Sequence, residues 1–360
     1  MLKRLSAIKP IHYMLLGFPL AVLGSWLEWD PVATFALACL GLIPLAELIV
    51  EATEALAVVT GPKIGGLLNA TLGNAAELII TIVAIQAGLL DLVKASITGS
   101  ILGNLLLVMG GSLFLGGLKN GRQRFSREHS ATNATMLVLA VVALSVPSLF
   151  NHTLTGEALP ERTLESISLG VAGVMIVLYA LGLIFSLRAS DSFSALTQTE
   201  AAEHGPHWPL RTAIMVLALT TGAVVWLSEI LVHSVEGVTA AFGLSEFFLG
   251  IILIPIVGNV AEHIVAVEVA IKNKMELSLE IALGSSLQIA LFVAPVLVFV
   301  SLMFGRYLNL VFNQFELLAM AAGVLIAALV ASDGETNWLE GAQLLGVYLI
   351  LGVAFFFLPV

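Results

Sequence analysis

The stretches that decide the fold are GNAAELI at residues 73–79 and GNVAEHI at residues 258–264, which lie 185 positions apart. The same offset carries Gly99-Ser100 onto Gly284-Ser285. Self-similarity at a fixed offset, with the matches in the same order, indicates two related halves of the chain. Such a series is much more specific than one short motif.

The residues around these stretches are mostly apolar. Of the 360 residues, 59% are hydrophobic and 11% are charged, and the mean hydropathy is +1.02, whereas soluble domains carry about 25% charged residues. This composition excludes a soluble globule, and the long apolar runs exclude a transmembrane barrel, whose strands alternate. The net charge of −10 argues against a nucleic-acid binder, and the single cysteine, Cys39, excludes a disulfide framework within the chain. We therefore expect an all-α polytopic membrane protein.

Division of the chain at polar, glycine and proline clusters predicts eleven transmembrane helices, since each needs about 20 mostly apolar residues. They lie near residues 11–28, 33–58, 64–88, 95–117, 132–150, 165–188, 209–235, 246–270, 278–304, 314–332 and 338–358. The first is read as a retained span outside the repeats and not as a cleaved signal. The predicted units are a cytoplasmic stub and first helix over residues 1–30, a five-helix repeat over 31–188, a cytoplasmic linker over 189–208 and a second five-helix repeat over 209–360.

Each predicted repeat has five helices, so the second is expected to enter the membrane from the opposite side. Inverted repeats that meet at a midplane site are typical of secondary transporters. With a cytoplasmic N-terminus, the inner loops hold twelve Lys or Arg residues and the outer loops hold three, Lys94, Arg162 and Arg306. Because basic residues favour the cytoplasmic side, we expect a cytoplasmic N-terminus and an external C-terminus.

Glu77 and Glu262 are the sharpest candidates for an ion site. Each follows an asparagine, Asn74 or Asn259, by three positions, which places both side chains on one helix face. No Lys or Arg lies well inside a predicted span to neutralise them, and an intramembrane charge costs about 2.5–3.5 kcal/mol. A shell of carboxylate, amide, carbonyl and water oxygens suits a hard cation such as Ca²⁺. The alternative is a structural Asn–Glu hydrogen bond between helices, which explains two inverted copies less well.

Irregular and small polar residues accompany the two motifs. Gly73, Gly258 and Pro255 are expected to break or kink their helices and to free backbone carbonyls beside a cavity. Candidates for the ion pathway, or for interhelical hydrogen bonds instead, are Ser100, Ser285 and Gln288. His263 adjoins Glu262 and is a candidate for tuning its protonation, with a packing role as the alternative.

Further acids lie upstream of both motifs, at an offset of 182. The pairs are Glu47 with Glu229 and Glu54 with Glu236, and the departure from symmetry is Glu51, which falls on His233. The first three acids share one helix face in the cytoplasmic half of the second span, and the other two lie in the outer half of the seventh. They predict an acidic vestibule on each side, or wet helix ends in the case of Glu54 and Glu236. Glu268 is expected to pair with Lys272, one turn away.

The motifs resemble those of a known family. GLLNATLGNAAELI at 66–79 and PIVGNVAEH at 255–263 resemble the two repeat motifs of the cation/proton exchanger (CAX) family of Ca²⁺/H⁺ antiporters, and GSIL at 99–102 and GSSLQ at 284–288 fit the helices that follow. The resemblance runs from about residue 10 to the end. It implies eleven spans, an acidic linker after the sixth, and a central Ca²⁺ site that uses Glu77 and Glu262. The linker departs from that pattern, because it has no continuous acidic run. The short N-terminus favours a prokaryotic plasma membrane.

Together these features predict a secondary transporter, and not an enzyme, that exchanges cytosolic Ca²⁺ for external H⁺ by alternating access. Its expected partners are Ca²⁺, H⁺ and the lipid bilayer, with no resident cofactor and with a homo-oligomer left open. The nearest rivals are Na⁺/Ca²⁺ and Mn²⁺/H⁺ exchange on the same scaffold. A membrane metalloprotease requires a His-Glu-x-x-His motif, which the order Glu262-His263 does not provide. A third alternative is an ion channel, which would show passive ion flux far above the rates of a transporter.

Overall fold

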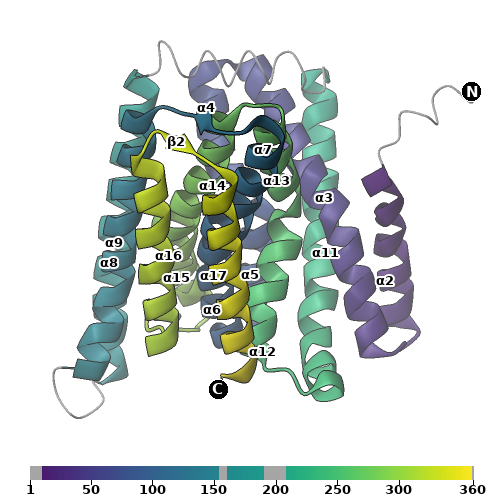
Figure 1. Cartoon of the computed structure of the whole chain (residues 1–360). Coiled ribbons are helices and arrows are strands. Elements are labelled where there is room, and N and C mark those ends of the chain that lie inside the picture. Colours follow the sequence, from purple (N-terminus) through teal and green to yellow (C-terminus); the bar gives the residue numbers. More distant parts are fainter. Residues whose placement is uncertain (1–9, 154–159, 190–207, 359–360) are drawn as a thin grey trace, which may run out of the picture.

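The computed structural model describes residues 10–153, 160–189 and 208–358, which are nearly all helical (Figure 1). The elements before residue 190 are the 3-10 helix η1 (Pro10–Leu16), α2 (Gly17–Trp26), α3 (Pro31–Thr60), α4 (Pro62–Leu72), α5 (Ala75–Ala87), α6 (Leu90–Leu102), the π-helical segment η2 (Gly103–Val108), α7 (Met109–Asn120), β1 (Gln123–Arg124), α8 (Arg127–Thr153) and α9 (Glu161–Ala189).

The elements after residue 207 repeat the alternation of long and interrupted helices. They are α11 (Leu210–Phe242), α12 (Glu246–Phe248), the π-helical segment η3 (Leu249–Leu253), α13 (Ile254–Ile271), α14 (Met275–Gln288), the π-helical segment η4 (Ile289–Val293), α15 (Ala294–Met303), α16 (Gln314–Ser332), β2 (Glu335–Thr336) and α17 (Trp338–Phe357).

Within the described residues, nine helices are long and apolar enough to cross a membrane, and the bent pair α4–α5 makes ten. The helix at Tyr13–Trp26, where the sequence predicts the first span, is shorter than these. The expectation of a polytopic helical membrane protein is therefore confirmed, while the count of eleven spans stays a prediction.

Local sequence explains where the long helices begin and end. The Asp30 side chain accepts a hydrogen bond from the amide of Ala33 at 3.1 Å, and Pro31 follows it as the first residue of α3. A proline loses nothing at that position, because the first amides of a helix have no partner within it. Gly61, with a φ of 82°, ends α3, and Pro62 begins α4. The dipeptide Asp30-Pro31 therefore marks the start of α3, and Gly61-Pro62 marks its end.

The interruptions take two forms. At Gly73 and Asn74 the helix breaks, so that α4 and α5 form an angle of 42°. The sequence predicts a similar break at Gly258, but α13 runs through this residue without interruption. The irregularity lies earlier, in η3, and Pro255 stands as the second residue of α13. A proline cannot donate to the preceding turn, and π-helical turns are a known way to accommodate such a local mismatch in a helix.

Two connections meet at one end of the molecule, the top in Figure 1. β1, which joins α7 to α8, pairs antiparallel with β2, which joins α16 to α17. Asn120 and Gln123 donate to the carbonyls of Ala270 and Ile271 at the end of α13, at 2.9 to 3.2 Å. The last residues of α17 lie at the opposite end (Figure 1). The pair of Glu268 with Lys272 is confirmed, at 2.6 Å.

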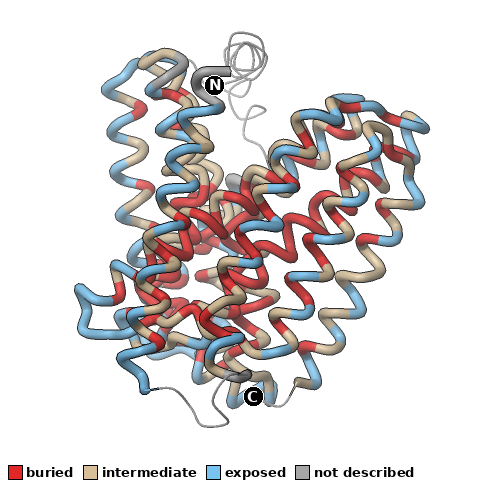
Figure 2. The backbone as a smooth tube through the Cα atoms, turned by 90° about the vertical axis from the view of Figure 1, so that its left-hand side faces the viewer, coloured by how far each residue is buried: buried red, intermediate tan, exposed pale blue. Residues whose placement is uncertain are grey.

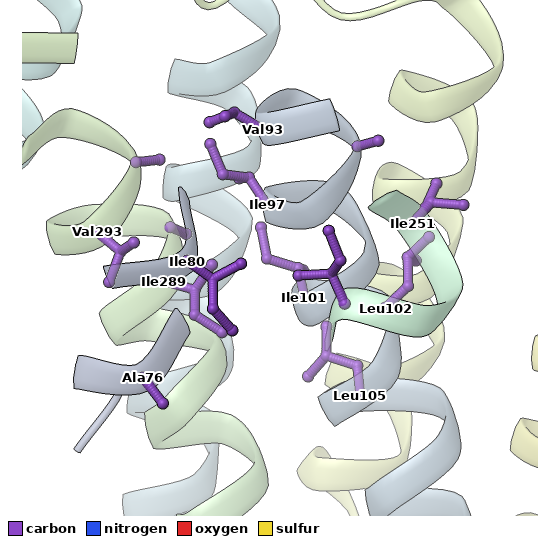
Figure 3. Close-up of a cluster of buried hydrophobic side chains, with 14 of the residues drawn as sticks. Ala76, Ile80, Val93, Ile97, Ile101, Leu102, Leu105, Ile251, Ile289 and Val293 are labelled. Atoms are coloured by element: carbon purple, nitrogen blue, oxygen red, sulfur yellow. The ribbon is translucent and has the colours of Figure 1, made fainter. Parts of the chain in front are cut away.

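Buried residues gather in the middle of the molecule, and the outer faces are exposed (Figure 2). The centre of the core contains Ile80 of α5, Ile97 and Ile101 of α6, Ile251 of η3 and Ile289 of η4 (Figure 3). The interrupted helices thus form the centre, while α9 and α17 have the smallest buried shares of the candidate spans in the described chain and expose apolar side chains such as Val177 and Leu349. A membrane protein needs such apolar outer faces, because they contact lipid and not water.

Candidate functional site

The first predicted carboxylate, Glu77, lies in the first turn of α5, directly after the break. A helix N-terminus favours a negative charge, because its free amides carry partial positive charge. Glu77 is fully buried. The Ser100 hydroxyl of α6 donates to Glu77 Oε1, and the Asn259 amide of α13 donates to Glu77 Oε2 at 3.2 Å. Helices from both halves of the chain therefore meet at this carboxylate.

The second carboxylate, Glu262, is one turn after Asn259 on α13. The Ser285 hydroxyl of α14 lies 2.8 Å from Glu262 Oε2 and 3.0 Å from Oδ1 of Asn74. The serine that hydrogen-bonds to each glutamate follows it by 23 residues in both cases. The two carboxylates thus have the same kind of partner from the next helix, and each also meets the asparagine of the other motif, directly or through Ser285.

Gln288 completes this network, because its Oε1 accepts from the Asn74 amide at 2.7 Å. We call this hydrogen-bonded set and the set formed by Glu77, Ser100 and Asn259 together the central cluster. Its members are Asn74, Glu77, Ser100, Asn259, Glu262, Ser285 and Gln288.

The two motif glycines make room for the cluster. A Cβ at Gly73 would lie 3.7 Å from Oε1 of Glu262 and 3.2 Å from Oε1 of Gln288. The nearest atom to a Cβ at Gly258 is the Cβ of Glu77, at 3.6 Å. Each glycine therefore faces the carboxylate residue of the other motif, and Gly73 is the more tightly enclosed of the two.

The central cluster contains two acids, of which Glu77 is fully buried and Glu262 is half-buried. Among the described residues, no Lys or Arg forms an ion pair with Glu77 or Glu262. A buried carboxylate without a compensating charge is costly, so hydroxyl and amide donors, a proton or a cation must stabilise it. No group of three or more His, Cys, Asp or Glu side chains in the described part of the chain could hold a metal ion. A cation here would thus be bound by two carboxylates together with amide and hydroxyl oxygens.

The other predicted pathway residues are distributed over two long helices. Glu47, Glu51 and Glu54 are half-buried on α3, which packs against α13. Glu229, His233 and Glu236 lie on an exposed stripe of α11, and the His233 ring bonds the carbonyl of Glu229 at 2.7 Å.

His263 is half-buried beside Glu262 and, within the described chain, is not among the side chains that hydrogen-bond to the central cluster's carboxylates. The structure therefore brings Ser100, Ser285 and Gln288 into the cluster, but not His263.

One buried acid is missing from the predicted set. Glu316, only 3% exposed, lies in the first turn of α16, accepts from Thr98 of α6 at 3.1 Å and forms a capping box with Asn313. The signal that could have found it is the pattern Asn-x-x-Glu before an apolar run, which is typical of a helix start. Its capping role explains its burial without any part in the central cluster.

Comparison with known proteins places the chain in a family. The sequence model of the sodium/calcium exchanger protein family matches residues 31–188 and 212–357. A Ca²⁺/H⁺ antiporter of Aphanothece halophytica is 47% identical over 360 residues, covering 96% of both chains. The Ca²⁺/H⁺ antiporter ChaA of Bacillus subtilis is 45% identical over 346 residues, covering 95% of this chain and 97% of that protein.

A solved structure agrees with these relatives. The native structure of YfkE superposes with a TM-score of 0.84 at 42% identity, over 97% of this chain and 100% of that one. The resemblance to the cation/proton exchangers is thereby confirmed. The chain belongs to the sodium/calcium exchanger protein family, whose members are transporters and not enzymes.

Proposed function

We propose that this protein exchanges cytosolic Ca²⁺ for external H⁺, with the central cluster as the shared binding site. The observation that carries the proposal is the pair of glutamates, fully buried Glu77 and half-buried Glu262. Each belongs to a hydrogen-bonded set with side chains from both halves of the chain, and neither has a basic ion-pair partner among the described residues. The two relatives above, at 47% and 45% identity, are named as Ca²⁺/H⁺ antiporters, which supports the same exchange here.

Competition for the same oxygens couples the two ions. Two ionised carboxylates and several neutral oxygens attract a divalent cation, whereas a protonated carboxyl is a poor cation ligand, so one ion displaces the other. The amides of Asn74 and Asn259 adapt to both states, because a 180° rotation exchanges amide oxygen and nitrogen. Asn259 then donates to Glu77, and Asn74 donates to Gln288, in one state, whereas both offer oxygen to Ca²⁺ in the other. Ca²⁺ is transported cargo in this scheme, and no resident cofactor is involved.

We further propose eleven spans, with α2 as a short first span followed by two inverted five-helix repeats over residues 31–188 and 209–360. Three observations support the inversion. The chain direction alternates from span to span (Figure 1), the family model matches residues 31–188 and 212–357, and η2 and η4 follow the two glycine–serine pairs at corresponding positions. The linker predicted at 189–208 includes residues 190–207, which lie outside the described residues.

The proposed orientation places the end with β1 and β2 in the cytoplasm. Basic residues near this end are Lys119, Arg122, Arg124, Arg127, Lys272 and Lys274, whereas the turns at the opposite end contribute Lys94, Arg162 and Arg306. Such a bias favours a cytoplasmic N-terminus and an external C-terminus. The similarity to bacterial relatives supports a prokaryotic plasma membrane.

In the proposed alternating-access cycle, Ca²⁺ enters from the cytoplasm past Glu47, Glu51 and Glu54 of α3. These acids are half-buried on a helix that packs against α13, which carries Asn259 and Glu262. Protons enter from outside along the acids of α11 and displace Ca²⁺ after the helices have rearranged. A single cluster that serves both ions needs only one gated path open at a time.

The test is ion flux in proteoliposomes with an acidic interior. Wild-type protein should take up Ca²⁺ and make the interior more alkaline at the same time. Glu77→Gln and Glu262→Gln should each lower Ca²⁺ uptake by about 30-fold or more, because losing one partner of a buried charge pair costs about 2–5 kcal/mol. Glu268→Gln is the matched control, because Glu268 is on α13 but pairs with Lys272, and its uptake should match wild type. Full exchange in both cluster variants would refute the proposal.

The same vesicles separate the two rival cargoes. A Na⁺ gradient that drives Ca²⁺ uptake without a pH gradient would indicate Na⁺/Ca²⁺ exchange. Mn²⁺ uptake that is faster than Ca²⁺ uptake under the same pH gradient would indicate Mn²⁺/H⁺ exchange. Ca²⁺ uptake that depends on the pH gradient alone supports the proposed pair of ions.

A further inference from the structure

A tyrosine outside the central cluster contacts the break that positions it. Tyr179 lies on α9, and its hydroxyl donates to the backbone carbonyl of Ala70 at 2.7 Å. In an uninterrupted helix that carbonyl would accept from the amide four residues later, which is Asn74. Since α4 ends at Leu72, Ala70 provides one of the terminal carbonyls that need a partner from elsewhere. The tyrosine hydroxyl supplies this partner.

The ring of Tyr179 is held from its other side by η4. It stacks on Phe292, with ring centroids 5.3 Å apart and an interplanar angle of 25°. η4 begins directly after Gln288, whose Oε1 accepts from the Asn74 amide at 2.7 Å. Tyr179 therefore bridges α4 and η4. Asn74 follows the end of α4 and Gln288 precedes η4, and these two residues hydrogen-bond in the cluster.

We propose that Tyr179 is a positioning residue that holds the bend between α4 and α5 and thereby sets the affinity of the central cluster for Ca²⁺. Without the hydroxyl, the carbonyl of Ala70 regains a partner only if the amide of Asn74 moves towards it. That movement straightens the bend and draws the Asn74 side chain away from Ser285 and Gln288. The inference rests on the proposed function, because the affected ligand is Ca²⁺ at this site.

Tyr179→Phe is the direct test, because it removes the hydroxyl and keeps the ring stacked on Phe292. In proteoliposomes we expect the KM for Ca²⁺ to rise about five- to tenfold, as loss of one hydrogen bond implies, with the maximal rate within about twofold of wild type. Tyr348→Phe is the matched control, because Tyr348 is a half-buried tyrosine on α17 that lines a surface groove with Phe248 and Ile252. Its KM should not change.

A merely structural role would lower the melting temperature and the amount of active protein without raising KM. Phe292→Leu is a second variant that loosens the ring and keeps the hydroxyl, and it should raise KM less than Tyr179→Phe. Unchanged KM in both variants would overturn the inference. If wild type and Tyr348→Phe fail to exchange Ca²⁺ for H⁺, the proposed function itself is wrong, so the two failures are distinguishable.

A double-mutant cycle tests the route through Asn74. Equilibrium Ca²⁺ binding is measured for Tyr179→Phe, Asn74→Ala and the double variant in detergent. If Tyr179 acts by placing Asn74, removing its hydroxyl adds less than twofold to the effect of Asn74→Ala. Full additivity of the two effects would show independent roles and would overturn the inference.

Discussion

The two motif glycines look equivalent in the sequence, but the structure predicts opposite outcomes when each is replaced by alanine. At Gly73 the new Cβ would lie 2.8 Å from the carbonyl oxygen of Asn69 and 3.2 Å from Oε1 of Gln288, whereas ordinary contacts begin at 3.4 Å. The carbonyl belongs to the backbone and cannot swing aside, so the bend must shift. At Gly258 the nearest atom is the Cβ of Glu77, at 3.6 Å, which is an ordinary contact.

The magnitude follows from the cost of overpacking, which is about 1–3 kcal/mol. Because the strained contacts involve Gln288, the partner of Asn74, the shift disturbs the central cluster directly. If this free energy is lost from Ca²⁺ binding, Gly73→Ala should raise the KM for Ca²⁺ about 5- to 150-fold. Gly258→Ala should leave KM within about twofold and slightly stabilise α13, since alanine exceeds glycine in helix propensity by about 1 kcal/mol.

Initial rates of Ca²⁺ uptake into acid-loaded proteoliposomes, measured over a range of Ca²⁺ concentrations, give KM for both variants. Melting temperatures in detergent show whether either variant is misfolded. A KM for Gly258→Ala that rises as much as that for Gly73→Ala would refute the reasoning. So would a KM for Gly73→Ala that stays within twofold of wild type.

Two further pairs of variants test the packing of the cluster. Gly99→Ala should destabilise the protein by more than about 3 kcal/mol, because its Cβ would lie 2.6 Å from the carbonyl carbon of Ile251. Gly284→Ala is the control, because a Cβ there meets nothing within 4 Å. Equal melting temperatures for the two variants would contradict this prediction. Ser285→Ala should raise the KM for Ca²⁺ about fivefold through loss of a hydrogen bond. Ser286→Ala should not, because the Ser286 hydroxyl donates to the carbonyl of Ala282 in its own helix, α14; similar KM values for the two serine variants would count against the site.

Some of these features follow from sequence and others do not. The repeated Gly-Asn-x-x-Glu pattern is enough to single out Glu77 and Glu262 as equivalent positions of the two motifs, and helix periodicity predicts that each shares a helix face with the asparagine of its own motif. The pattern does not say that Asn259 donates to Glu77 while Asn74 pairs with Gln288. Such contacts between residues distant in sequence depend on how helices cross, and one sequence carries no signal for that.

The predicted helix break at Gly258 is a second feature that one sequence alone does not determine. The glycine of each motif, together with Pro255 in the second, suggests two interruptions, yet only the first is a bend, at Gly73, while the second is a π-helical segment before Pro255. Both satisfy the backbone in a membrane, and tertiary packing decides which one forms. Tyr179 contributes to that decision on one side only, and nothing about it in the sequence distinguishes it from other aromatic residues in the spans.

The Ser285 hydroxyl has fewer hydrogens than neighbouring acceptor oxygens. It carries a single hydrogen, but Glu262 and Asn74 both present an acceptor oxygen to it, at 2.8 and 3.0 Å. At any instant one of the two oxygens accepts the hydrogen bond and the other does not. When Glu262 gains a proton it becomes a donor to Ser285, and the serine hydrogen turns to the Asn74 oxygen, which then has less to offer a cation. When the proton leaves, the hydrogen returns and that oxygen is freed. In the proposed exchange, loading a proton on Glu262 thus withdraws the Asn74 oxygen from the cation, so the rotating Ser285 hydroxyl would transmit the competition between H⁺ and Ca²⁺ from one motif to the other.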